Sequence, residues 1–141
     1  MATIIQMLMD DHRIITSLFD DYEASRTPEV AMRLGDALVL HACVEEAFLY
    51  PLVRTALVGG QRLAYEAEDD HEKVKDFVAE AEDTRGDALD ELIFELRYDV
   101  DVHMRWEEED LFPRLAELLD EVTLHDVARR VLAFKRRQPV A

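Results

Sequence analysis

Apolar residues recur three and four positions apart along four long stretches of the chain, which is the spacing of amphipathic helices. One such stripe runs through Leu89, Ile93 and Leu96. No segment alternates apolar and polar residues over the length of a strand. The pattern therefore predicts long helices at about 3–24, 28–57, 61–83 and 87–120, and a shorter helix near 123–136.

Short breaker segments separate these stretches. Thr27 and Pro28 form a helix cap followed by a first-turn proline, Gly59-Gly60 ends the second stretch, and a turn around Gly86 ends the third. Short connections between long helices predict an all-α fold, an antiparallel up-down-up-down four-helix bundle, with a short extra C-terminal helix capped by Thr123. We expect residues 1–122 to form the bundle and residues 123–141 to add the short helix and a basic tail.

The pattern HxxxEExxL[YF]P occurs twice, beginning at His41 and at His103, 62 residues apart. An Asp-Asp-His triplet precedes each copy and ends at His12 and at His71. The chain thus divides into two similar halves, about 1–59 and 60–122. Both copies end in a proline (Pro51 and Pro113) that should kink or locally break its helix, because proline lacks the amide hydrogen of a helical residue.

Charge narrows the classes of partner. The 141 residues hold 16 basic and 32 acidic side chains, a formal net charge of −16, which argues against binding to nucleic acid or an anionic membrane. The lone Cys43 and the lack of an uncharged apolar stretch of membrane-spanning length favour a cytoplasmic protein. Residues 126–137 carry five basic side chains, so a protein partner could bind through this tail; we expect a monomer or homodimer.

Spacing within the repeat indicates a metal site. A His and a Glu four residues apart share one face of a helix, so His41 with Glu45, and His103 with Glu107, each present an imidazole and a carboxylate to the interior. His12 and His71 lie on the apolar stripes of the other two helices. Buried carboxylates need compensation, and a polyvalent cation compensates them together.

The six groups suit two metal ions that share the two carboxylates, and imidazole with carboxylate fits Fe, Mn or Zn better than Ca or Mg. The di-iron pattern of ferritin-like proteins, Glu-x-x-His on two helices, fits only Glu68 with His71.

The set of four His and two HxxxE pairs, followed by LYP or LFP, resembles the haemerythrin-like family of HHE cation-binding proteins. The resemblance extends from His12 to Pro113. It implies an oxo- or hydroxo-bridged di-iron centre with two Fe ions, although Mn and Zn accept the same ligands. The implied metal ligands are His12 and His41 on one ion, His71 and His103 on the other, and Glu45 and Glu107 as bridges.

One departure from the family bears on function. Oxygen-carrying haemerythrins have a further His one turn after the third-helix ligand, where this chain has Lys75. Fewer ligands leave more exchangeable positions, unless Lys75 or water fills them, so the resemblance favours an oxidoreductase of catalase or peroxidase type that acts on hydrogen peroxide, dioxygen or both. Reversible oxygen binding or storage is the alternative, and sensing of iron, oxygen or nitric oxide is a further one.

Other side chains near the ligands divide into supporting and surface groups. Asp110, Lys75 and Trp106 are candidates to support the ligands through hydrogen bonds or packing. Glu46 and Glu108 lie about 100° away from the ligand face, which favours pairing at the surface. The four tyrosines are candidates for a phenolate ligand, but they lie off the ligand stripes, so we expect them in the core or in an interface.

Overall fold

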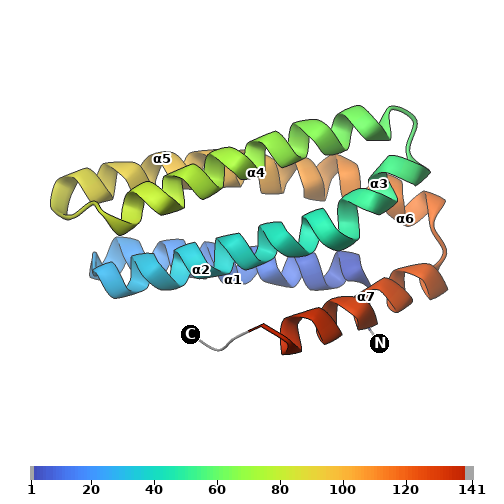
Figure 1. Cartoon of the computed structure of the whole chain (residues 1–141), viewed down its shortest axis with the longest axis horizontal. Helices are drawn as coiled ribbons and strands as arrows, with labels where there is room; N and C mark the ends of the chain where they lie inside the picture. The colour runs from blue at the N-terminus through green and yellow to red at the C-terminus, as the bar shows by residue number, and fades with distance from the viewer. Residues whose placement is uncertain (1, 139–141) are drawn as a thin grey trace.

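The computed structural model describes residues 2–138, and within this part of the chain every regular element is helical. Four long helices lie side by side along the longest axis of the molecule (Figure 1): α1 (Ile4–Ser25), α2 (Pro28–Val44), α4 (Gly60–Glu82) and α5 (Gly86–Trp106). The all-α prediction is confirmed.

The first two helices begin as local sequence chemistry predicts. The hydroxyl of Thr3 accepts a hydrogen bond from the backbone N–H of Gln6, and the Gln6 side chain accepts one from the N–H of Thr3. This reciprocal capping box satisfies two otherwise free donors at the start of α1. At the start of α2 the hydroxyl of Thr27 accepts a hydrogen bond from the backbone N–H of Val30, and Pro28 follows at the first helical position, where a missing N–H costs nothing.

Each interior proline follows a widened helical turn. The π-helical turns η1 (Glu45–Leu49) and η2 (Glu107–Leu111) lie directly before the short helices α3 (Tyr50–Ala56) and α6 (Phe112–Leu118). The predicted interruption at Pro51 and Pro113 thus takes the form of one π turn per repeat. Such turns are rare and occur often at functional sites.

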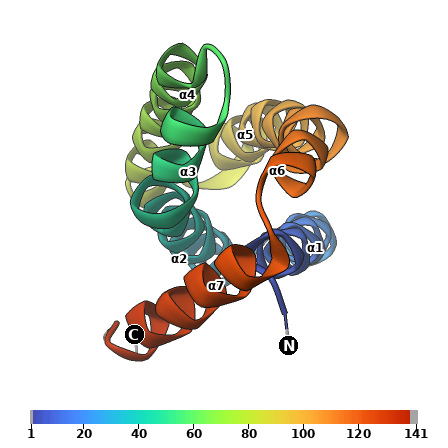
Figure 2. The same cartoon turned by 90° about the vertical axis from the view of Figure 1, so that its right-hand side faces the viewer.

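The last helix, α7 (Glu121–Arg136), begins earlier than we expected, and its cap is a different residue. The carboxylate of Asp120 accepts a hydrogen bond from the N–H of Thr123 at 2.8 Å, so Thr123 lies inside the first turn and does not cap the helix. Figure 2 shows α7 crossing beside α1 and α2. Its inner face, which includes Val127 and Val131, is buried in one core cluster with Ile4 of α1.

Two apolar clusters fill the interior of the molecule. One lies where α3, α6 and α7 meet the start of α1, and the other lies toward the α1–α2 and α4–α5 connections. On α1 the first cluster ends at Leu8 and the second begins at Ile15, which leaves His12 between them. The polar site therefore lies where the two clusters meet. No helix among residues 2–138 combines the length and the apolar character that a membrane span requires.

Candidate metal centre

Four imidazoles, one from each long helix, point their Nε2 atoms toward two buried carboxylates. Glu45 and Glu107 are completely buried. The distances from each imidazole to a carboxylate oxygen are 3.2 Å for His12 to Glu107, 3.5 Å for His41 to Glu45, 3.0 Å for His71 to Glu45 and 3.4 Å for His103 to Glu107. Residues from all four helices therefore meet at one point in the interior.

The ligand atoms fall into two groups, each compact enough to surround one cation. In the first group, His12, His41, Glu45 and Glu107 each offer an atom within 4.8 Å of the others. In the second group, Glu45, His71 and His103 do the same. Glu45 belongs to both groups, so its carboxylate lies where a bridge between two ions would lie.

The outward nitrogen of every imidazole lies beside a carboxylate. The four pairs of Nδ1 and carboxylate oxygen are His41 with Asp11 at 3.2 Å, His103 with Asp70 at 3.2 Å, His71 with Glu46 at 3.4 Å and His12 with Glu108 at 2.7 Å. Each carboxylate belongs to a repeated motif and contacts a His on another helix. The Asp that precedes His12 or His71 contacts the His of an HxxxE pair, and the Glu that follows Glu45 or Glu107 contacts His71 or His12. An Nδ1–H donated to a carboxylate leaves the Nε2 lone pair free to face a metal ion.

Several inward atoms have no satisfactory partner among residues 2–138. The buried atoms His12 Nε2, His41 Nε2, Glu45 Oε2 and Glu107 Oε1 make no hydrogen bond of proper geometry. Buried polar atoms are rarely left unpaired, because each costs free energy. Four of them converging on one spot, all with the chemistry of metal ligands, fit a bound cation.

Comparison with protein families agrees with this geometry. The family model of the haemerythrin HHE cation-binding domain matches residues 3–90, more than half of the chain. The chain belongs to this haemerythrin family. The match spans His12, His41, Glu45 and His71, whereas His103 and Glu107 lie beyond it and are added by the structure. Comparisons with curated proteins and with solved structures gave no significant match.

Tyr50 is a further residue of the haemerythrin-like site, although its position off the ligand stripe favoured the core or an interface. It is completely buried, and its hydroxyl lies 3.1 Å from Nε2 of His71, 3.3 Å from Nε2 of His103 and 3.3 Å from Oε1 of Glu45. The matched position in the second repeat is Phe112, whose ring stacks on that of His12 with centroids 5.8 Å apart. The second metal-ligand group thus has a phenol where the first has a hydrocarbon ring.

The three candidate supporting residues lie in different surroundings. The carboxylate of Asp110 is exposed and lies 3.5 Å from Arg114, so it holds no imidazole; Glu108 has that role for His12. The Lys75 ammonium donates to Glu46 at 3.1 Å and therefore reaches the site only through that carboxylate. The Trp106 ring packs against His103, with centroids 5.6 Å apart.

Glu46 and Glu108 differ from our expectation, because their side chains reach imidazoles rather than pairing only at the surface. A position about 100° from the ligand face points between two helices in a packed bundle, and a glutamate is long enough to contact the neighbouring helix. The doubled Glu-Glu in the repeat was the sequence signal for this role.

The acid–base properties of the site show how strongly its charges interact when protons are the only cations present. Burial alone would lower the pKa of His41, but the carboxylate of Glu45 and the hydrogen bond with Asp11 outweigh it and raise that pKa to about 10. Burial also opposes ionisation of Glu45, yet the neighbouring His41 holds the pKa of that carboxyl well below its usual range. Burial and the two central carboxylates raise the pKa of the Tyr50 phenol.

A cavity of about 240 Å³ gives access to the site from the side of α4 and α5. It reaches His41, His71 and His103, and Asp70, Lys73 and Tyr98 also line it. Tyr98 and Lys73 are exposed, so the outer part of this cavity is polar and open to water. A small hydrophilic molecule can approach three of the four imidazoles along it.

Proposed function

We propose that this chain is an up-down-up-down four-helix bundle that holds two iron ions and reacts with hydrogen peroxide, dioxygen or both. Catalase-like disproportionation of peroxide is the activity we favour. The observation that carries the proposal is the pair of ligand groups that share Glu45 and enclose four unpaired buried atoms. Mn and Zn accept these ligands as well, so metal analysis belongs to the test.

Each ligand would have a defined part. His12 and His41 would hold one ion and His71 and His103 the other. Glu45, which belongs to both ligand groups, and Glu107, which lies 3.2 Å from His12 and 3.4 Å from His103, would be shared by the two ions. A pair of iron ions held there would supply the redox chemistry that peroxide disproportionation requires. The carboxylates beside each Nδ1 fix the tautomer and the ring orientation, so the four Nε2 atoms stay aimed at the same point.

The residues around the ligands leave the site accessible to small molecules, which favours turnover. Lys75 pairs with Glu46, so it does not replace the further His of oxygen carriers. The ring of Phe112 packs on that of His12, while the cavity at Tyr98 and Lys73 leaves His41, His71 and His103 accessible. The Tyr50 hydroxyl, within hydrogen-bond distance of His71 and His103, can hold or release a proton beside a small bound molecule.

The test is reconstitution of the full chain with Fe(II), followed by metal analysis, an optical spectrum and an oxygen electrode during addition of peroxide. We expect close to two irons per chain and release of oxygen from peroxide. Glu45→Ala should lose both, because Glu45 belongs to both ligand groups, whereas Glu66→Ala on the exposed face of α4 should retain both. Fewer than about one metal per chain would overturn the di-iron proposal. A stable, reversible oxygen adduct without turnover would instead establish an oxygen-binding protein.

A further inference from the structure

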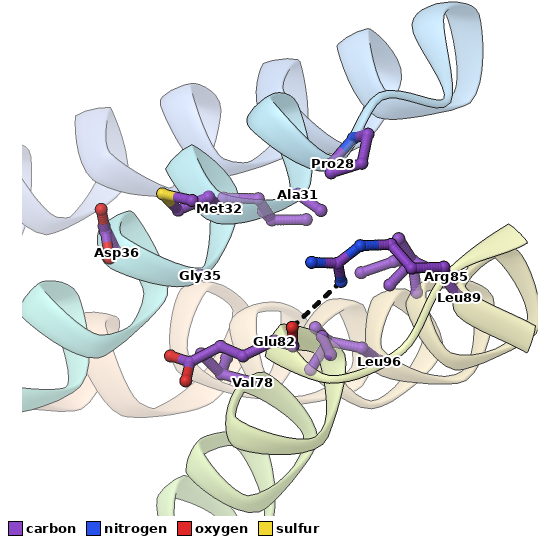
Figure 3. A pocket seen from close by; sticks show the side chains of 13 residues that line it. Pro28, Ala31, Met32, Gly35, Asp36, Val78, Glu82, Arg85, Leu89 and Leu96 are labelled. Carbon is purple, nitrogen blue, oxygen red and sulfur yellow. Dashed lines mark hydrogen bonds between the residues drawn. The ribbon is translucent and has the colours of Figure 1, made fainter.

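A second cavity lies between α2, α4 and α5, away from the ligands and next to the α4–α5 connection. Its volume is about 110 Å³. The side chains that form its inner wall are aliphatic, and Ala31, Val78, Leu89 and Leu96 are among them (Figure 3). We call it the distal cavity, and the one that reaches the imidazoles the proximal cavity.

Polar groups are confined to the rim of the distal cavity. Asp36, Glu82 and Arg85 are exposed. The side chain of Arg85 extends across the opening, and its Nη1 donates to the backbone carbonyl of Glu82 at 3.0 Å (Figure 3). The inner wall has no polar side chain that could hold a water molecule. Apolar cavities of about this size bind small apolar molecules such as xenon.

The distal cavity lies in line with the proximal one. Each of the three helices contributes consecutive turns to the two cavities: Leu34 then Leu38 on α2, Val78 then Val74 on α4, and Leu96 then Val100 on α5. His41 follows Leu38 in the wall of the proximal cavity. From Leu34 to His41 the rise along α2 is about 10 Å. A row of aliphatic side chains thus runs from the distal cavity toward the ligands, and we call the path along this row the crevice.

Gly35 lines the distal cavity at the point where α2 faces Val78 of α4. A Cβ atom at this position would lie 3.0 Å from Cγ1 of Val78 on α4, closer than two side-chain carbons normally approach. Because Gly35 has no side chain, α2 and α4 approach each other closely here. No side-chain atom of residue 35 occupies the space between the two helices.

We propose that the distal cavity binds an uncharged, apolar gas molecule of the size of dioxygen and that the crevice delivers it to the metal centre. The delivery step rests on the function proposed above, whereas the binding step does not. A polar molecule such as peroxide gains nothing from an aliphatic wall and loses its hydrogen bonds to water there. It reaches the ligands through the proximal cavity, past Lys73 and Tyr98.

Xenon tests the binding step in the metal-free protein. Under xenon pressure, the NMR signals of residues around Ala31 and Val78 should shift in a saturable way. Ala81→Leu fills the distal cavity, because Ala81 lines it, and should abolish these shifts. Ala79→Leu, the same change two residues away on the exposed face of α4, should leave them intact. Absence of xenon-dependent shifts in the wild-type protein, or their persistence in Ala81→Leu, overturns the proposal.

The delivery step is tested by stopped-flow kinetics of the Fe(II)-loaded protein. Ala81→Leu should slow the reaction with dioxygen severalfold and leave the reaction with peroxide unchanged, while Ala79→Leu should change neither. Gly35→Ala is a second variant that narrows the crevice while improving the local helix propensity, so it retains the fold and should slow dioxygen in the same selective way. Equal dioxygen rates in all variants overturn the route. If the chain fails to load iron, the proposed function is overturned. The xenon experiment still decides whether the distal cavity binds an apolar gas, because it uses the metal-free protein.

Discussion

The carboxylate of Asp11 lies 3.2 Å from Nδ1 of His41, and the same carboxylate accepts hydrogen bonds from Lys135 at 3.2 Å. Asp11 is on α1, His41 on α2 and Lys135 on α7, so three helices meet at one side chain. Burial works against the charge of Asp11, but the contacts with His41 and Lys135 outweigh it and lower its pKa. The last helix is thereby connected to a candidate metal ligand through two polar contacts.

Asp11→Asn should weaken metal binding at the first ligand group by about 10- to 100-fold, as is typical when the carboxylate behind a ligating imidazole is lost. The amide no longer accepts the Nδ1–H as a charged group does, so the orientation and basicity of the His41 ring are less well fixed. Competition between the protein and a chelator of known affinity measures the change. Asp10→Asn is the matched control, because Asp10 is exposed and pairs with Arg13. Equal losses in both variants would mean that general acidity, not the contact with His41, controls the affinity.

Lys135→Met should weaken metal binding by less, at most about fivefold, because the pair it removes is partly exposed and Asp11 retains its contact with His41. Arg136→Met, which alters the exposed neighbour in the same helix, should have no effect. The same chelator competition checks both. The basic tail of α7, which we considered as a binding surface for a protein partner, then also has a structural role through Lys135. If Lys135→Met binds metal with wild-type affinity, α7 contributes to the fold by packing and not to metal binding.

The contact between Tyr22 and Asp90 predicts a loss of stability at high pH. The Tyr22 hydroxyl donates to Asp90 at 2.7 Å, and burial together with this bond raises the pKa of Tyr22 to about 12. The folded protein thus keeps a proton that the unfolded chain loses near its ordinary pKa of about 10. The stabilisation is fully present below pH ~10 and is lost as the pH rises to about 12, an effect of about 1 to 2 kcal/mol.

Urea unfolding of the metal-free protein across this pH range measures the effect as a decrease in the free energy of unfolding. Tyr22→Phe should show a smaller decrease than the wild-type protein, because it lacks the titrating group. Tyr65→Phe should match the wild-type protein, since Tyr65 is exposed. If Tyr22→Phe and the wild-type protein lose stability in parallel, the hydrogen bond to Asp90 does not cause the pH dependence.

Helical periodicity predicted which side chains point inward as far as Glu45 and Glu107. Directly after these two residues its predictions of side-chain direction were wrong, because a π turn begins at each. At about 100° per residue, Tyr50 lies about 140° from Glu45 and so off the ligand face. In the structure the π turn intervenes, and the N–H of Tyr50 bonds to the carbonyl of Glu45, five residues back. The wider turn changes the direction in which Tyr50 points. The proline after Tyr50 predicted an interruption, but not that it would bring a phenol to the ligands.

The role of Glu46 and Glu108 beside the imidazoles was not predicted from the sequence, for a different reason. Glu46 and Glu108 contact histidines on other helices, and a contact between helices depends on how these pack, which periodicity within one helix does not give. Their recurrence in both repeats was visible, as was that of Asp11 and Asp70. The recurrence of these carboxylates in both repeats was thus a better indication of their role than their angular position on the helix.

Tyr50→Phe should weaken binding of the ion held by Glu45, His71 and His103 and leave the other ion in place. The variant should fold, because phenylalanine occupies the matched position in the second repeat and only the hydroxyl is lost. That hydroxyl is 3.1 Å from Nε2 of His71 and 3.3 Å from Nε2 of His103, so its removal takes a polar contact from both imidazoles of the second ligand group. Its other contacts, with Glu45 at 3.3 Å and Glu107 at 3.4 Å, are with carboxylates that also belong to the first group.

Titration of the metal-free protein with Fe(II) against a chelator should show two binding steps in the wild-type protein. In Tyr50→Phe the weaker step should lose about tenfold in affinity, in line with losses at groups that adjoin metal ligands. Tyr22→Phe removes another buried tyrosine hydroxyl, far from the ligands and beside Asp90, and should keep both steps unchanged. Two unchanged steps in Tyr50→Phe would show that the phenol does not contribute to metal binding. A loss at both steps would show that it acts through Glu45, which both ligand groups share.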